Sequence, residues 1–146
     1  MIRTDMPRVY ISLGTNLGER EANIDTALRL LCREFGRPWL EISDIVNTEA
    51  VGFDGPDFLN AVVCFETALA PGQVLALCKR VEKEMGRSDA PEYNSDGRRV
   101  YHDRIIDIDI LDYEGVRMRT DALTIPHARL RERPFFRRLL RQVRGK

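Results

Sequence analysis

Asp107 and Asp109 stand two positions apart in "RIIDIDILD" (104–112), a segment whose other residues are mostly apolar. Side chains alternate between the two faces of a strand, so both carboxylates would share one face with Ile105 and Leu111. Aspartate is depleted in strands, and two carboxylates on one face repel each other unless a positive charge lies between them. Mg²⁺ binds through one or two carboxylates together with substrate phosphates. The spacing therefore favours a metal-dependent phosphate site, although a solvent-facing polar strand face would show the same alternation.

Basic residues gather near this pair of aspartates. Arg104 directly precedes the apolar run, and Arg87, Arg98 and Arg99 lie in the segment 87–103. Arginine side chains bind phosphate oxygens bidentately, so the cluster suits a polyphosphate. The segment shows no periodicity, and loops longer than about 12–15 residues are often functional or disordered. We therefore predict a long catalytic loop over 87–103.

The elements that would position these residues follow from the spacing of apolar residues and turn formers. Predicted strands cover 8–14, 39–47, 58–67 and 104–113, and predicted helices cover 21–36 and 71–86. A turn at Glu114-Gly115 and a hairpin come after the last strand. This β-α-β-β-α-β order is typical of a ferredoxin-like α+β domain, a mainly antiparallel sheet with helices packed on one face. We predict a single domain over 1–146, whose other sheet face is covered by loops, by the C-terminal tail or by a ligand.

Composition narrows the class of protein. Hydrophobic residues make up 43% and charged residues 32% of the 146 residues, as in soluble globular proteins, and no apolar run is long enough to span a membrane. The first residues lack the apolar stretch of a signal peptide. Cys32, Cys64 and Cys78 lie far apart without metal-ligand spacing. We expect a cytoplasmic protein, or one in an equivalent reducing compartment, with free buried cysteines and no zinc site.

Charge is unevenly distributed along the chain. Residues 129–146 carry eight Lys/Arg and one Glu, a net +7, while the remaining residues carry 15 Lys/Arg and 22 Asp/Glu, a net −7. A basic tail on an acidic body is compatible with contacts to an anion, a protein or nucleic acid, and equally with a solvated helical end.

Several further motifs resemble one family. The motifs are "VYISLGTNLGER" (9–20), "FLNAVVCFET" (58–67), "EKEMGR" (82–87), "DRIIDIDIL" (103–111), "LTIPH" (123–127) and "RERPFF" (131–136). In this order, from Val9 to Phe136, they resemble the 6-hydroxymethyl-7,8-dihydropterin pyrophosphokinases of folate biosynthesis. The resemblance implies a ferredoxin-like fold and transfer of pyrophosphate from ATP to the pterin, which releases AMP. It also implies a monomer that binds these two small molecules, with neither nucleic acid nor a membrane as a partner.

The resemblance also implies a role for each matching residue. Asp107 and Asp109 would hold two Mg²⁺ ions that bridge the phosphates of ATP. The residues matched to catalysis are Arg87 and Arg104, with Arg98 or Arg99 in place of a second loop arginine. Those matched to the pterin are Thr48, Val51, Phe58, Asn60, Tyr101 and Phe135. Those matched to the nucleotide are Glu82, Arg104, Ile110, Thr124, His127 and Arg133. By default, Phe58 and Phe135 would be core residues and His127 a structural hydrogen-bonding residue.

The chain also departs from the family pattern. Tyr101 stands where the family commonly has tryptophan, and the catalytic loop is several residues longer. Ala122 and Ala128 replace residues that contact the nucleotide, which predicts weaker or differently arranged ATP binding. The final segment "RRLLRQVRGK" does not resemble the usual C-terminal stretch, which leaves the C-terminal architecture open.

Three alternatives stay open, two of which belong to other classes of function. A nucleotidyltransferase-like enzyme also uses a strand-borne Asp-x-Asp, but the chain shows neither a Gly-Ser phosphate loop nor a third strand carboxylate. A ferredoxin-like RNA-binding module would need a basic pI, whereas the pI is about 6.7. The third alternative is a catalytically weakened family member that binds pterin or nucleotide without efficient turnover.

Overall fold

The computed structural model describes residues 6–49, 55–86, 92–93, 99–100, 105–130 and 132–144. The strands are β1 (Arg8–Thr15), β2 (Glu41–Ile42), β3 (Val46–Thr48), β4 (Phe58–Glu66), β5 (Glu92–Tyr93), β6 (Arg99–Val100), β7 (Asp107–Tyr113), β8 (Met118–Arg119) and β9 (Thr124–Ile125). The helices are α1 (Arg20–Phe35), α2 (Pro71–Glu84), the short 3-10 helix η1 (Ala128–Leu130) and α3 (Pro134–Val143).

The main sheet has the strand order β2-β4-β1-β7, with β3 also paired to β4, and every pair in it is antiparallel. Because β4 lies between β1 and the β2–β3 edge, the first strand-helix-strand unit is split by another strand. The predicted α+β class is confirmed. The finer ferredoxin-like assignment stays a prediction that this strand order supports.

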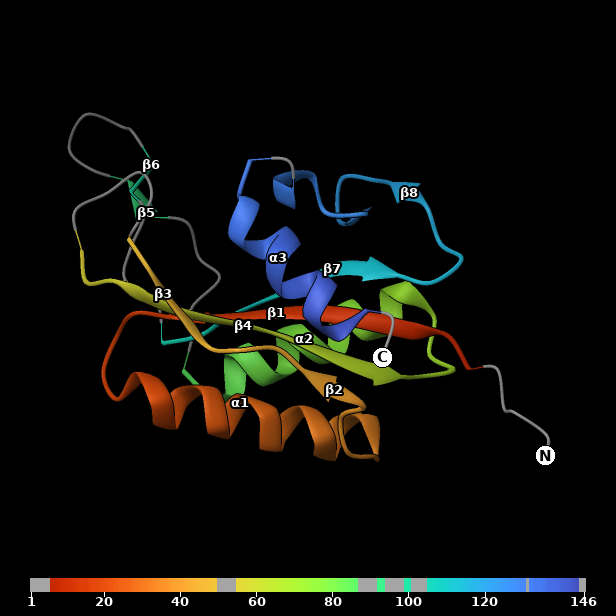
Figure 1. The fold of residues 1–146 in the computed structure, drawn as a ribbon, viewed down its shortest axis with the longest axis horizontal. Helices are drawn as coiled ribbons and strands as arrows, with labels where there is room; N and C mark the ends of the chain where they lie inside the picture. Colours follow the sequence, from red (N-terminus) through yellow and green to blue (C-terminus); the bar gives the residue numbers. More distant parts are fainter. Residues whose placement is uncertain are drawn as a thin grey trace.

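Helices cover both faces of the sheet, and Figure 1 shows α1 below it and α3 above it. The larger apolar cluster lies between the sheet and α1 and α2, and it includes Ile106, Ile108 and Ile110, as the alternation predicts. A second cluster lies between the sheet and α3. Loops, the C-terminal tail or a ligand were expected to cover the second face, and the structure shows that α3 of the C-terminal tail packs on it.

The tail is an amphipathic helix. Phe136, Leu139, Leu140 and Val143 are buried at helical spacing, whereas the arginines of α3 are exposed. The expectation of a solvated helical end is therefore right for the basic residues and wrong for the apolar ones. At the end of α3, Arg144 forms an ion pair with Asp112 and lies 5.3 Å from the centroid of the Tyr10 ring.

The predicted strand over 39–47 is two short strands, because Ser43 interrupts the backbone ladder between them. Its amide donates to the Val62 oxygen at 2.9 Å, but its hydroxyl oxygen, and not a backbone carbonyl, accepts from the Val62 amide at 2.8 Å. The next residue, Asp44, is bound by Gln142 of α3, which accepts from its amide at 2.8 Å and donates to its carboxylate at 3.1 Å. The break between β2 and β3 is thus an attachment point for α3.

The last strand of the main sheet begins at Asp107, later than predicted. Ile105 precedes it and packs against the core under α1 and α2, so its predicted place on the aspartate face is wrong. The register with β1 shifts between Tyr10 and Ile11, a β-bulge that puts Leu111 and Asp112 on the face of α3. The predicted hairpin after this strand is the β8–β9 pair.

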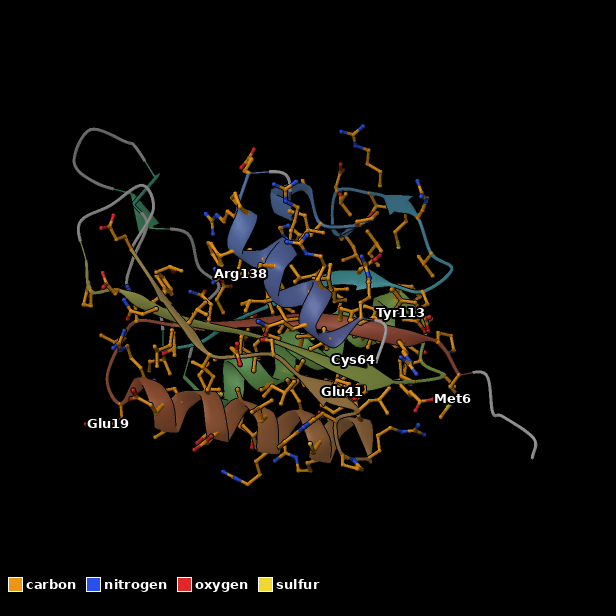
Figure 2. All side chains as sticks on the ribbon, in the orientation of Figure 1. Met6, Glu19, Glu41, Cys64, Tyr113 and Arg138 are labelled. Carbon is orange, nitrogen blue, oxygen red and sulfur yellow. The ribbon has the colours of Figure 1, made fainter. Side chains whose placement is uncertain are left out.

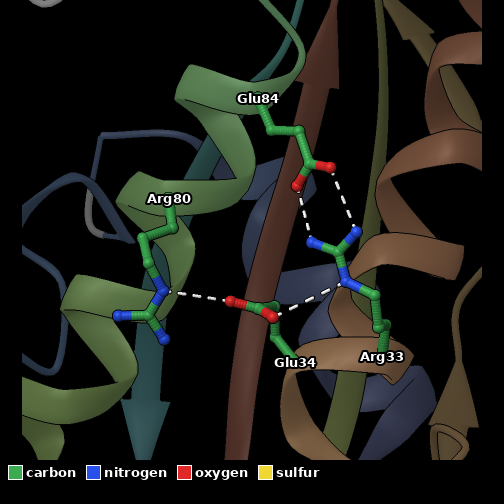
Figure 3. Close-up of polar contacts among 4 residues, drawn as sticks. All are labelled: Arg33, Glu34, Arg80 and Glu84. Atoms are coloured by element: carbon green, nitrogen blue, oxygen red, sulfur yellow. Dashed lines mark hydrogen bonds and ion pairs between the residues drawn. The ribbon is translucent and has the colours of Figure 1, made fainter.

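Two arginine-carboxylate pairs join α1 to α2 (Figure 3). Arg33 donates to both oxygens of Glu84, at 3.0 and 2.6 Å, and Arg80 donates to Glu34 at 3.0 Å. The hydrogen bonds from Arg33 hold the pKa of the Glu84 carboxyl below its usual value. These exposed pairs lie on the helical layer, away from the aspartates of β7.

The helices were also compared with the length and hydropathy that a membrane span requires. Among the described residues, none of them meets both requirements.

Candidate active site

One row of residues crosses three strands on the face that α3 partly covers. In the strand register Asn60 of β4 stands opposite Gly14 of β1, and Gly14 stands opposite Asp107 of β7. The next row along the same face consists of Val62, Ser12 and Asp109. Since neighbouring strands lie about 4.8 Å apart, Asn60 and Asp107 are separated by roughly 10 Å, two inter-strand spacings. The sheet therefore brings together an amide and two carboxylates from distant parts of the chain.

The two aspartates lie on the predicted face and are half-buried. The residues beside them on β1 are small, because Gly14 has no side chain and serine carries only a hydroxymethyl group. The Oγ of Ser12 lies 3.5 Å from the backbone oxygen of Asp109. Among the described residues, no group of three or more His, Cys, Asp or Glu side chains could hold a metal ion. Mg²⁺ commonly binds through one or two carboxylates and takes its remaining ligands from substrate phosphates and water, so this pair of aspartates is compatible with it.

Asn60 is the buried polar residue of the row, with 5% of its surface exposed. Its Nδ2 donates to Thr48 Oγ1 at 2.7 Å, and Thr48 stands opposite Phe58 in the β3–β4 register. Three residues predicted to bind the pterin therefore lie together at one end of this strand pair. Phe135 lies on the same side of the sheet at the start of α3, packed against Phe136 with ring centroids 4.3 Å apart.

Three of the residues predicted to line the nucleotide, Glu82, Ile110 and His127, lie along the outer edge of β7. Glu82, only 1% exposed, accepts from the Ile108 amide at 2.8 Å. Because backbone groups alternate along a strand, the amide and carbonyl of Ile110 also point to this edge, whereas its side chain is buried in the core. His127 lies beside this edge, since its amide donates to the Leu111 oxygen at 2.9 Å. Thr124 lies in β9, close in sequence to His127, and Arg133 directly precedes α3.

Comparison of the sequence with known proteins identifies its family. A model of the 7,8-dihydro-6-hydroxymethylpterin-pyrophosphokinase family matches residues 10–145. The chain belongs to this family. It is therefore a pyrophosphokinase of folate biosynthesis, which passes pyrophosphate from ATP to 6-hydroxymethyl-7,8-dihydropterin. The match extends past Phe136, so it includes the rest of α3, of which the motifs in the sequence covered only the first turn.

Curated relatives agree with this assignment. The chain is 40% identical over 140 residues to the 2-amino-4-hydroxy-6-hydroxymethyldihydropteridine pyrophosphokinase of Porphyromonas gingivalis. The aligned region covers 94% of this chain and 91% of that protein. The chain is 34% identical over 127 residues to the enzyme of the same name from Bacillus subtilis, covering 86% and 71%. The mitochondrial folate synthesis bifunctional protein of Pisum sativum is 41% identical over 135 residues, 92% of this chain but only 24% of that longer protein.

Some predicted site residues of this pyrophosphokinase lie outside the described residues. They are Val51, Arg87, Arg98, Tyr101 and Arg104, and for Arg99 only the backbone is described, within β6. The pairing of β5 with β6 was not predicted, because the sequence shows no periodicity over 87–103.

Two features of the pyrophosphokinase site were missed by reasoning from the sequence. Gly14 adjoins both Asn60 and Asp107, and a glycine inside a strand pattern was the available signal for such a close approach. Arg20 contacts the residues before Thr48 and Phe58, and no local pattern marks it. A hollow lined by 112–117 and Pro126 lies toward the other end of β7 and contains none of the predicted site residues.

Proposed function

We propose that the chain transfers the β,γ-pyrophosphoryl group of ATP to the hydroxymethyl oxygen of the pterin on the sheet face bearing Asn60, Gly14 and Asp107. The observation that carries this proposal is the row itself. In this row Gly14, which has no side chain, lies between the amide of Asn60 and the carboxylate of Asp107. The amide suits a polar ring, and the carboxylates of Asp107 and Asp109 suit metal-bound phosphates. Two substrates could therefore lie side by side, with the reacting oxygen near the aspartates.

The pterin half of the proposal rests on Asn60 and its neighbours. A carboxamide both donates and accepts hydrogen bonds, as the edge of a pterin ring requires, and the bond to Thr48 already fixes the orientation of Asn60. Phe58 and Phe135 would stack on the two faces of the ring. Val51 and Tyr101 complete this half by their resemblance to family positions.

The nucleotide half rests on the outer edge of β7. There the backbone of Ile110 presents one donor and one acceptor, which a purine base can pair with. Thr124, His127, Glu82 and Arg133 would surround the rest of the nucleotide. His127 and Arg133 are half-buried, so their cationic or donor groups can approach a phosphate or ribose without full loss of water.

Asp107 and Asp109 would hold two Mg²⁺ ions, which supply neutralisation of phosphate charge and alignment of the transferred group. The chain's own contribution is to hold two carboxylates on a rigid strand. Arg87, Arg104 and either Arg98 or Arg99 would donate to the phosphate oxygens, whose charge spreads during transfer.

The proposal also includes that the protein acts as a monomer and that it acts in a reducing compartment such as the cytoplasm. The three free thiols support the second point.

The direct test is incubation of the protein with ATP, Mg²⁺ and 6-hydroxymethyl-7,8-dihydropterin. We expect AMP and the pterin diphosphate in equal amounts, with no ADP. Pterin binding by calorimetry together with no AMP would favour the catalytically weakened alternative.

Gly14→Ala is expected to weaken pterin binding about tenfold, close to 1.4 kcal/mol. A Cβ at this position would lie 3.2 Å from Asn60 Oδ1 and 3.6 Å from Phe58 Cδ1, so the amide must shift. The control is Gly72→Ala, where a Cβ meets nothing within 4 Å. That variant should bind pterin normally and gain about 0.4–1 kcal/mol of stability. Equal pterin affinity of the two variants, measured by calorimetry, would contradict the tight packing of Asn60 against β1.

A further inference from the structure

Arg20, the first residue of α1, links the two strands that carry the proposed pterin contacts. Its Nη1 donates to Asn47 Oδ1 and to the backbone oxygen of Asp57, both at 2.9 Å. Asn47 Nδ2 in turn donates to Asp57 Oδ2 at 2.7 Å. These three residues, the Arg20 network, close a ring of hydrogen bonds across the ends of β3 and β4.

The Arg20 network lies one residue away from the proposed pterin contacts. Asn47 directly precedes Thr48, and Asp57 directly precedes Phe58, its partner in the β3–β4 register. Since side chains alternate, Asn47 points to the face of α1 while Thr48 points to the face of Asn60. Arg20 therefore cannot touch a pterin bound beside Asn60, and any effect it has must pass through the strands.

The strand that Arg20 holds is poorly secured by its own ladder. β3 is three residues long and, in the described part of the chain, pairs with β4 alone. Such a short edge strand gains little from pairing, so side-chain bonds decide its position. A second hydrogen bond joins the segment before β4 to the loop before α1. In it, Asn16 Nδ2 donates to the backbone oxygen of Pro56 at 3.1 Å.

We propose that Arg20 is a positioning residue of the pterin site. By joining Asn47 to Asp57 it fixes the spacing at which Thr48, Phe58 and Asn60 converge, and it thereby sets the affinity for the pterin. This inference rests on the proposed function of that site. The affinity for the nucleotide is expected not to depend on Arg20, because Ile110 and the Glu82 and His127 contacts are at β7, on the far side of β1 from β3.

The experiment compares Arg20→Ala, Arg20→Lys and Arg33→Ala with the wild-type protein. Arg33 is the matched control, because it lies on the same helix and makes its bidentate pair with Glu84 of α2, and not with a residue beside β3 or β4 (Figure 3). Calorimetry gives the Kd of the pterin in the presence of Mg²⁺ and a non-hydrolysable ATP analogue, and the Kd of the analogue alone. Amide hydrogen exchange of residues 46–48 and 58–60 in the free protein reports the strands directly.

For Arg20→Ala we expect a pterin Kd raised about tenfold, an analogue Kd within about twofold of wild type, and faster exchange in both segments. Arg20→Lys should recover part of the pterin affinity, because one ammonium can donate to both oxygens. Arg33→Ala should leave the pterin Kd and the exchange of these segments unchanged. A wild-type pterin Kd for Arg20→Ala would overturn the inference, and so would equal losses for pterin and analogue. Failure of the wild-type protein to bind pterin would instead overturn the proposed function, and the positioning role with it.

Discussion

Asp107→Asn and Asp109→Asn are each expected to lower the rate of AMP formation by at least about a thousandfold. Bound metal supplies several kcal/mol of charge stabilisation in the transition state, and about 1.36 kcal/mol corresponds to a factor of ten in rate. Asparagine keeps the shape of the side chain and removes the charge that attracts Mg²⁺. Both residues lie half-buried on one face of β7, so the folded protein should persist, without the repulsion between two carboxylates.

Asp112→Asn is the matched control for this experiment. Asp112 lies on the same strand, beyond the bulge, and its carboxylate pairs with Arg144 of α3. That substitution should cost a little stability and leave the rate nearly normal. Rates come from single-turnover quench experiments, and titration of Mg²⁺ with the ATP analogue shows whether metal affinity has fallen. Near-normal AMP formation by both Asp107 and Asp109 variants would eliminate the metal assignment.

Long elements of the fold were predictable because their signals are local. α1 and α2 show apolar residues at helical spacing, Gly36 ends the first, and Pro71 begins the second. The breaks were not predictable, since they depend on partners. Ser43 interrupts an alternating segment only because its hydroxyl meets the Val62 amide. The prediction for Ile105 is wrong for the same reason, because the strand alternation holds only from Asp107, where pairing with β1 begins.

The same distinction between local signals and partner-dependent features applies to the residues of the candidate site. Asp107 and Asp109 stand out from their spacing in one strand, and the resemblance to a family supplied the roles of the other residues. That Asn60 and Asp107 share a row with Gly14 between them depends on the pairing of three strands far apart in sequence. The Arg20 network likewise joins residues 27 and 37 positions apart. Such contacts are fixed by register and topology, which no local pattern records.

The C-terminal helix shows how charge can obscure a packing signal. Four apolar residues recur at helical spacing in α3, but the arginines between them favoured the interpretation as a basic tail. Figure 2 shows Arg138 on α3 and Cys64 on the strand beneath it. The helix also bears Phe135 at its start and is bound at its other end through Gln142 and Arg144. Its docking should therefore affect both stability and the proposed pterin site.

Leu139→Ala is expected to lower the free energy of unfolding by about 2–5 kcal/mol, the usual cost of removing a buried leucine side chain. Leu139 is fully buried against the sheet in the cluster that contains Tyr10 and Cys64. Arg138→Ala, at the neighbouring exposed position, should change stability by no more than about 0.5 kcal/mol. Urea denaturation of the two variants gives both values. A change below about 0.5 kcal/mol for Leu139→Ala would show that α3 contributes little to the folded state.

Thiol labelling distinguishes loss of α3 alone from unfolding of the whole domain. Cys64 lies under α3, and burial raises its pKa to about 12, so it should react with thiol reagents only after the helix leaves the sheet. Cys78 is on the buried face of α2, within the other core, where burial also raises its pKa. If α3 detaches as a unit, Leu139→Ala should accelerate labelling of Cys64 much more than that of Cys78. Equal acceleration of both thiols would mean that α3 leaves only when the domain unfolds, because both cores then open in a single cooperative step.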